Sequence, residues 1–204
     1  MDEDLLQKAM KMFEEDKKPD KWYAFMELMN RSGKIQNRWW QRLQTEVYNR
    51  EREFYENNPD WNWEIKIYGD SEIKWFIKGN SENEDVIIIH FNENNFTIFF
   101  DGWGQLDSEK VSNLLQDKKY DVIGNSIEIA GKNQKATSIW ESNLRNFRFD
   151  SIYDGRFPNS QTLSWYAGNR TNDFAEKLIA KVRKIQTHTK LFEEIIKECR
   201  KDNQ

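Results

Sequence analysis

Carboxylates and lysines recur at short intervals between residues 60 and 74. The side chains in question are Asp60, Glu64, Lys66, Asp70, Glu72 and Lys74. A hard cation such as Mg²⁺ is held by a few oxygen ligands that converge in one cleft. The stretch therefore suggests a magnesium site, provided that the surrounding elements bring the oxygens together.

A further acid precedes this stretch on a long amphipathic segment. On a helical wheel of about 100° per residue, Glu46 and Glu53 share the azimuth of Ile35 and lean toward the apolar side. A helix followed by a hairpin sheet with two Glu-x-Lys tripeptides resembles the layout of the PD-(D/E)XK nucleases. The resemblance implies an Asp and a Glu-x-Lys on adjacent strands around Mg²⁺, with a further acid from the helix.

The spacing departs from that family's pattern at two places. Asp60 is too close to Glu64 for the two to occupy different strands, and the strands after Asp70 read IIIHF and TIFFD, without a Glu-x-Lys. Glu-x-Lys is also common on the solvated strand faces of a chain this rich in both residues. A metal-dependent nuclease is therefore the alternative functional hypothesis.

The sequence does not contain the residue patterns that other common catalytic sites require. The chain has two histidines, His90 and His188, in no paired metal-binding motif, and its one cysteine, Cys199, lies on an apolar helical stripe. P-loop, nucleophile-elbow and dinucleotide-binding patterns are absent from the sequence. A single cysteine also excludes an intrachain disulfide. Apart from the carboxylates described above, we expect no cofactor and no enzymatic activity.

The composition indicates a folded, acidic protein. Of 204 residues, 37% are hydrophobic and 32% charged, but nine Trp, seven Tyr and thirteen Phe can fill a core. The formal charge of −4 disfavours non-specific nucleic-acid binding and favours a basic protein partner. Stacking of single-stranded nucleic acid on exposed Trp is a third hypothesis. With no signal-peptide pattern and no membrane-spanning run, we expect a cytoplasmic protein without membrane contact.

Hydrophobic periodicity predicts an α+β fold. Helices are expected over 4–15, from Trp22 to a break at Ser32-Gly33, and from about Ile35 to Tyr55. Short polar turns separate four strand-like segments, which predict a four-stranded antiparallel meander with the third strand at its centre. The segments are 61–69, 72–80, 85–91 and 95–100.

The second half of the chain is less regular. A helix is expected from an N-cap at Ser108 to about Lys118. Residues 120–168 give weak strand signals at SIEIA, FRFDSIY and TLSWYAGN. A long helical segment, interrupted at 187–189, closes the chain. We divide it into a helical N-terminal segment, 1–58, and a sheet core with C-terminal helices, 59–204, which we expect to fold as one cooperative unit.

Two adjacent tryptophans receive different roles from the helical wheel. Trp39 falls in the apolar arc and is predicted to be a core residue, whereas Trp40 falls at its edge and is predicted to meet either a second layer of the same protein or a partner. Tyr48 extends that edge, and Trp103 lies in a turn, so Trp40, Tyr48 and Trp103 are the predicted partner-binding residues. Large aromatic side chains dominate protein interfaces.

The favoured functional hypothesis is therefore a non-catalytic, inhibitor-type protein that binds another protein. Immunity proteins, anti-defence proteins and accessory subunits are the classes in question. The richness in Asn, Lys, Glu and Ile is typical of AT-rich prokaryotic or phage genomes.

Overall fold

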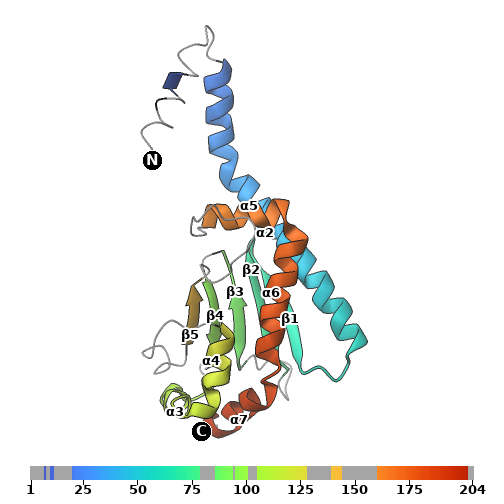
Figure 1. The fold of residues 1–204 in the computed structure, drawn as a ribbon, viewed down its shortest axis with the longest axis vertical. Helices are drawn as coiled ribbons and strands as arrows, with labels where there is room; N and C mark the ends of the chain where they lie inside the picture. Colours follow the sequence, from blue (N-terminus) through green and yellow to red (C-terminus); the bar gives the residue numbers. More distant parts are fainter. Residues whose placement is uncertain are drawn as a thin grey trace.

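The computed structural model describes residues 7, 10, 11, 20–78, 86–93, 95–100, 105–127, 139–143 and 160–201. The first helix with described bounds is α2 (Asp20–Asn57), a single helix of 38 residues. The predicted break at Ser32-Gly33 is wrong, because one glycine costs a helix only about 1 kcal/mol and Ser32 Oγ donates to Met29 O at 2.8 Å, within the helix. The N-terminal part of α2 extends beyond the sheet and the helices α6 and α7 (Figure 1).

A five-stranded antiparallel sheet follows, in the order β1-β2-β3-β4-β5. The predicted meander is confirmed, with one strand more than expected. Its strands are β1 (Trp63–Tyr68), β2 (Glu72–Ile77), β3 (Ile88–Phe91), β4 (Asn95–Phe99) and β5 (Ile139–Asn143). The third strand is the central one, as its uniformly apolar sequence predicted. Gly69, with φ of +53°, supplies the left-handed residue of the β1–β2 turn.

One face of the sheet forms the core. A row of apolar side chains crosses all five strands in register: Ile65, Trp75, Ile89, Ile98 and Trp140. Rings from the helices pack against this face, since Trp40 of α2 lies 6.1 Å from Phe91, and Phe192 lies 5.6 Å from Trp63. Because side chains alternate along a strand, the next row faces the other side: Lys66, Lys74, His90 and Thr97.

In the described part of the chain, three short helical elements lie between β4 and β5, and a fourth follows β5. They are α3 (Ser108–Leu114), the 3₁₀ turn η2 (Lys118–Tyr120), α4 (Asp121–Ile127) and α5 (Ser160–Asn169). The N-cap of α3 is Asp107, one residue before the predicted Ser108, because its carboxylate accepts from the amides of Glu109 and Lys110. The predicted strand TLSWYAGN is wrong, since it lies in α5. SIEIA begins in α4, and FRFDSIY lies outside the described residues.

Two helices close the fold, α6 (Thr171–Gln186) and α7 (Thr189–Cys199). The predicted interruption at 187–189 is confirmed. The N-cap position of α6 is Arg170, which makes no side-chain capping bond, and Thr171 Oγ1 donates to Ala167 O at 2.7 Å. Within the described ranges, no helix combines the length and apolar character needed to cross a bilayer.

Candidate functional site

The Glu-x-Lys tripeptides lie side by side on β1 and β2, on the face opposite the core. Lys66 and Lys74 are register partners. Each lysine pairs with the carboxylate of its own strand: Lys66 Nζ lies 2.8 Å from Glu64 Oε1, and Lys74 Nζ lies 3.2 Å from Glu72 Oε2. His90 Nε2 lies 3.7 Å from the same Glu72 oxygen. Both carboxylates are thus already neutralised by neighbouring cations.

The other predicted metal ligands lie elsewhere. Asp70, in the β1–β2 turn, accepts from Asn37 Nδ2 at 2.9 Å and from Gln41 Nε2 at 2.7 Å, which ties the turn to α2. Glu46 accepts from Arg50 Nε at 2.6 Å on the same helix. Glu53 and Asp60 are exposed. Across the described ranges, no group of three or more His, Cys, Asp or Glu side chains could hold a metal ion.

The structure does not bring the predicted partner-binding residues, Trp40, Tyr48 and Trp103, together on one described surface. Trp40 is only 2% exposed and packs against Phe91 and Phe174, each 6.1 Å away, so it meets a second layer of the same protein, one of its two predicted alternatives. Trp39 is the half-buried one, pressed against Gly168 of α5. Tyr48 is partly buried against the core. Trp103 lies outside the described residues.

The acid that α2 does bury is Glu51, which the sequence analysis missed. Its carboxylate Oε1 accepts from Arg183 Nη2 of α6 at 2.9 Å, in a site with no solvent exposure of the Glu51 side chain. Burial raises the pKa of Glu51, although the charge of Arg183 and a polar contact with Tyr55 oppose the shift. Glu51 falls four residues after Val47, on the buried azimuth of the helix. That position was the signal available in the sequence.

Aromatic rings surround the guanidinium of this buried pair. Arg183 stacks on Phe54, with its guanidinium carbon 3.5 Å from the ring centroid. Burial is also the largest cause that raises the pKa of Tyr55, whose phenol therefore stays protonated. We interpret the cluster as a structural network between α2 and α6.

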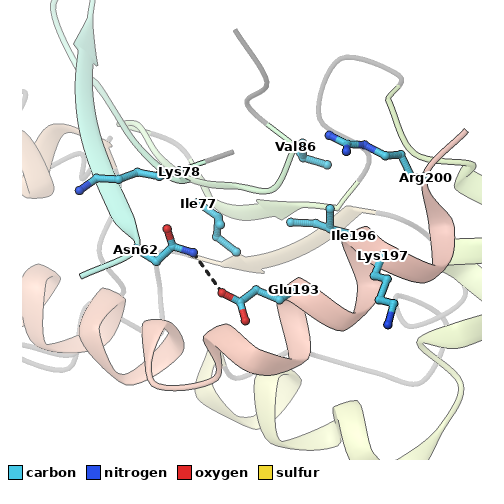
Figure 2. A pocket seen from close by; sticks show the side chains of 8 residues that line it. All are labelled: Asn62, Ile77, Lys78, Val86, Glu193, Ile196, Lys197 and Arg200. Carbon is cyan, nitrogen blue, oxygen red and sulfur yellow. Dashed lines mark hydrogen bonds between the residues drawn. The ribbon is translucent and has the colours of Figure 1, made fainter. Parts of the chain in front are cut away.

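A hollow of about 360 Å³ opens between β2 and α7. Its walls include Ile77, Val86 and Ile196, and Asn62 Nδ2 donates to Glu193 Oε1 at 3.0 Å across it. Figure 2 shows the lysine side chains, Lys78 and Lys197, pointing away from this pair, and Lys78 Nζ donates to Trp61 O at 3.1 Å. These lysines do not converge on a common ligand position.

A second hollow of about 400 Å³ lies at the start of α6, between Arg42, Glu46 and residues 169–173. Arg42 Nη1 donates to Gly168 O at 2.8 Å, which joins α2 to the end of α5. Arg170 lies 3.8 Å from Asp173. Arg42 and Arg170 of this hollow are thus held by partners within the protein.

Among the described residues, an unusual surface is the N-terminal part of α2, residues 20–34, which we call the projecting segment. Every residue in it is exposed. Its large apolar side chains are 38–67% exposed: Trp22, Tyr23, Phe25, Met26, Leu28 and Met29. The rings of Trp22 and Phe25 lie 5.9 Å apart. The sequence showed their helical spacing, but not that this half of the helix would stand clear of the core.

The arrangement as a whole is suited to contact with a macromolecule. If a side chain of this size presents roughly 200 Å², the exposed apolar area of the projecting segment is on the order of 600 Å². This area is at the upper end of the range for the largest apolar patch on a typical monomer, a few hundred Å².

Comparison of the chain with models of protein families, with curated proteins and with solved structures finds no match.

Proposed function

We propose that this is a non-catalytic protein-binding protein, of the kind that inhibitors, immunity proteins and accessory subunits represent, and that the projecting segment of α2 is its contact surface. The observation that carries the proposal is the exposure of large apolar side chains along a helix that stands clear of the core. Tyr23 and Leu28 are 67% and 58% exposed. Aromatic residues and Met are enriched in protein interfaces.

The hydrophobic effect favours a state in which a partner covers the projecting segment. A helix that carries apolar side chains on most of its circumference is normally buried. Here Tyr23 and Leu28 lie on opposite flanks of the helix, about 140° apart at 100° per residue. A partner that covers both flanks would remove apolar area that water otherwise solvates, at roughly 25 cal/mol per Å².

The partner we propose is another protein with an apolar groove that accepts a single helix. The formal charge of −4 would speed its encounter with a basic partner. The arrangement of the carboxylates supports a role without catalysis, because Glu64 and Glu72 are each paired with a lysine.

The test is affinity capture with the full chain, followed by titration calorimetry with the captured protein in purified form. Tyr23→Glu with Leu28→Glu should weaken binding at least tenfold, that is by about 1.4 kcal/mol or more. Asn49→Glu is the matched control, because it adds a charge to an exposed position of the same helix outside the projecting segment. Binding by the control should equal that of the wild type.

Two results would contradict the proposal. One is equal binding by the wild type and by the Tyr23→Glu, Leu28→Glu variant. The other is cleavage of DNA or RNA by the purified chain in the presence of Mg²⁺, lost on Glu64→Ala or Glu72→Ala. The second result would favour the nuclease hypothesis.

A further inference from the structure

We propose that single-stranded nucleic acid binds along one side of α2, with its phosphates on a row of cations and a base on an exposed tryptophan of α5. The row, which we call the basic stripe, consists of Arg31, Lys34, Arg38 and Arg42. At 100° per residue, these four residues lie within an arc of about 80° on α2. This surface is distinct from the one in the proposed function, because the stripe lies on the side of the helix opposite Met29.

The basic stripe carries positive charge that the protein does not neutralise. All four of its residues are exposed. Arg31 forms an ion pair with Glu27 one turn earlier, but Lys34, Arg38 and Arg42 form no ion pair with a carboxylate of the described residues. Lys34 and Arg38 are four residues apart on the helix, a spacing at which like charges repel. A row of phosphates along the stripe would replace this repulsion by attraction.

The stripe ends at the second hollow, where α5 is followed by α6. Arg42 Nη1 donates to Gly168 O at 2.8 Å, which holds the guanidinium at the edge of the hollow. A carbonyl carries no formal charge and a guanidinium has five N–H donors, so Arg42 keeps its charge and most of its donors for a phosphate. Arg170 lines the same hollow. Its contact with Asp173, at 3.8 Å between two exposed side chains, is of the weak surface type.

An exposed tryptophan lies on α5 beside this hollow (Figure 1). Trp165 is 44% exposed, and its ring packs edge-on against the buried Tyr166, with the centroids 5.2 Å apart. Asn169, which lines the hollow, donates through Nδ2 to Trp165 O at 3.0 Å, and residues four apart share a helix face. A partly exposed indole beside cations is the arrangement on which an unpaired base stacks. Because a base in a duplex is not free to stack on a side chain, we assign a single strand.

The length and charge of the stripe set the expected strength of binding. From Arg31 to Arg42 the helix rises about 17 Å, over which a stacked strand carries roughly five phosphates. The formal charge of −4 does not oppose this contact strongly, because charges beyond a Debye length of about 8 Å are largely screened at physiological salt. With about four phosphate contacts, the logarithm of the binding constant should fall with the logarithm of the salt concentration at a slope of about −3.

The experiment is fluorescence anisotropy of labelled oligo-dT and oligo-U of about 12 nucleotides, titrated with the full chain from about 50 to 200 mM NaCl. Both strands should bind with the slope given above. Lys34→Glu with Arg38→Glu should weaken binding at least tenfold and bring the slope to about −1.5. Lys118→Glu with Lys190→Glu is the matched control, because it changes the net charge equally at exposed positions of η2 and α7. The control should retain the wild-type affinity and slope.

Trp165 gives a second, independent readout. Trp165→Ala should weaken binding about tenfold without changing the salt slope, because lost stacking releases no counterions. Trp165→Phe should keep most of the affinity, since a phenyl ring still offers a face to a base. Circular dichroism and the melting temperature show whether each variant remains folded, so that a loss of affinity is not mistaken for a loss of structure.

Three results would overturn the proposal. They are the absence of binding at the lowest salt concentration, equal losses in the stripe variant and its matched control, and binding of a duplex or of poly-glutamate as tight as that of oligo-dT. The last result would identify a general anion-binding surface. None of them affects the capture experiment with Tyr23 and Leu28, so the failure of the nucleic-acid surface and the failure of the proposed function can be told apart.

Discussion

Glu51 of α2 and Arg183 of α6 form a salt bridge of 2.9 Å in which the glutamate side chain has no solvent exposure and the arginine side chain is 21% exposed. The second carboxylate oxygen, Glu51 Oε2, has no hydrogen-bond partner within the described part of the chain. A buried pair of this kind gains attraction in a low-dielectric site but loses the hydration of both charges. Its main effect is to fix how α2 packs against α6.

Removing one member of the pair should cost more than removing both. We expect Arg183→Met to lower the free energy of unfolding by about 3 kcal/mol, because it strands a buried carboxylate. The double variant Glu51→Leu, Arg183→Met should recover most of that loss. Urea denaturation of the single and double variants measures the coupling, and additive losses would show that the two residues act independently.

The pH dependence of stability should change in Glu51→Gln. Since burial raises the folded-state pKa of Glu51 above 4.5, the folded protein holds this proton more tightly than the unfolded chain. Its contribution to stability is then complete below about pH 4.5 and is lost as the pH rises through the folded-state pKa. Relative to the wild type, Glu51→Gln should therefore gain stability from pH 4.5 to pH 7. Urea denaturation across that range tests this, and parallel curves would contradict it.

A buried amide anchors α2 to the β1–β2 hairpin. Gln44, 3% exposed, donates through Nε2 to Tyr68 O at 3.1 Å and to Glu72 O at 3.0 Å. Gln44→Ala should cost about 1–3 kcal/mol, because it removes a buried side chain that donates to two backbone carbonyls. Gln41→Ala, which removes only an exposed bond to Asp70, should cost less than about 1 kcal/mol. Equal losses in chemical denaturation would refute the distinction.

The contact between α5 and α2 depends on a glycine. A Cβ at Gly168 would lie 2.3 Å from Trp39 Cδ1 and Cγ, in a buried position. Gly168→Ala should lower the melting temperature and cost about 1–3 kcal/mol through overpacking. Gly33→Ala, with no atom near its Cβ position, is the control and should not lower it. A neutral Gly168→Ala would show that Trp39 can move aside.

Mg²⁺ should not stabilise the protein. Glu64 and Glu72 already pair with lysines, and Asp70 is held by two amides. A ligand that binds only the folded state raises the melting temperature by mass action. We expect no rise in melting temperature at millimolar Mg²⁺. A rise in melting temperature that disappears on Glu72→Gln would revive the alternative metal site.

The sheet was predictable because its signals are local. Alternating side chains and short polar turns fix the hairpins, and the register then follows from which face is apolar. Lys66 and Lys74 on one face, with Ile65 and Trp75 on the other, already show this in the sequence. The fifth strand was not predictable in the same way, because Ile139–Asn143 pairs with β4 across a long separation in the chain.

The prediction of the helices was wrong where contacts with other elements decide which face is buried. Hydrophobicity alone placed Trp39 inside and Trp40 at the edge, whereas the buried face of α2 follows Trp40, Leu43, Gln44, Val47 and Glu51. Two of these are polar, and their burial depends on carbonyls of the β1–β2 hairpin and on a guanidinium from α6. The carboxylates of residues 60–74 could be placed on strands from sequence, but their pairing with lysines requires the register.

A rod of 38 residues extends about 57 Å, and α2 spans two very different environments over that length. We expect its second half to exchange amide protons only through openings that approach global unfolding, because it is packed into the core. Its first half can fray from the tip at a small cost. The same helix should therefore show a steep gradient of hydrogen-exchange protection near residue 35, and any molecule that binds the tip should flatten it.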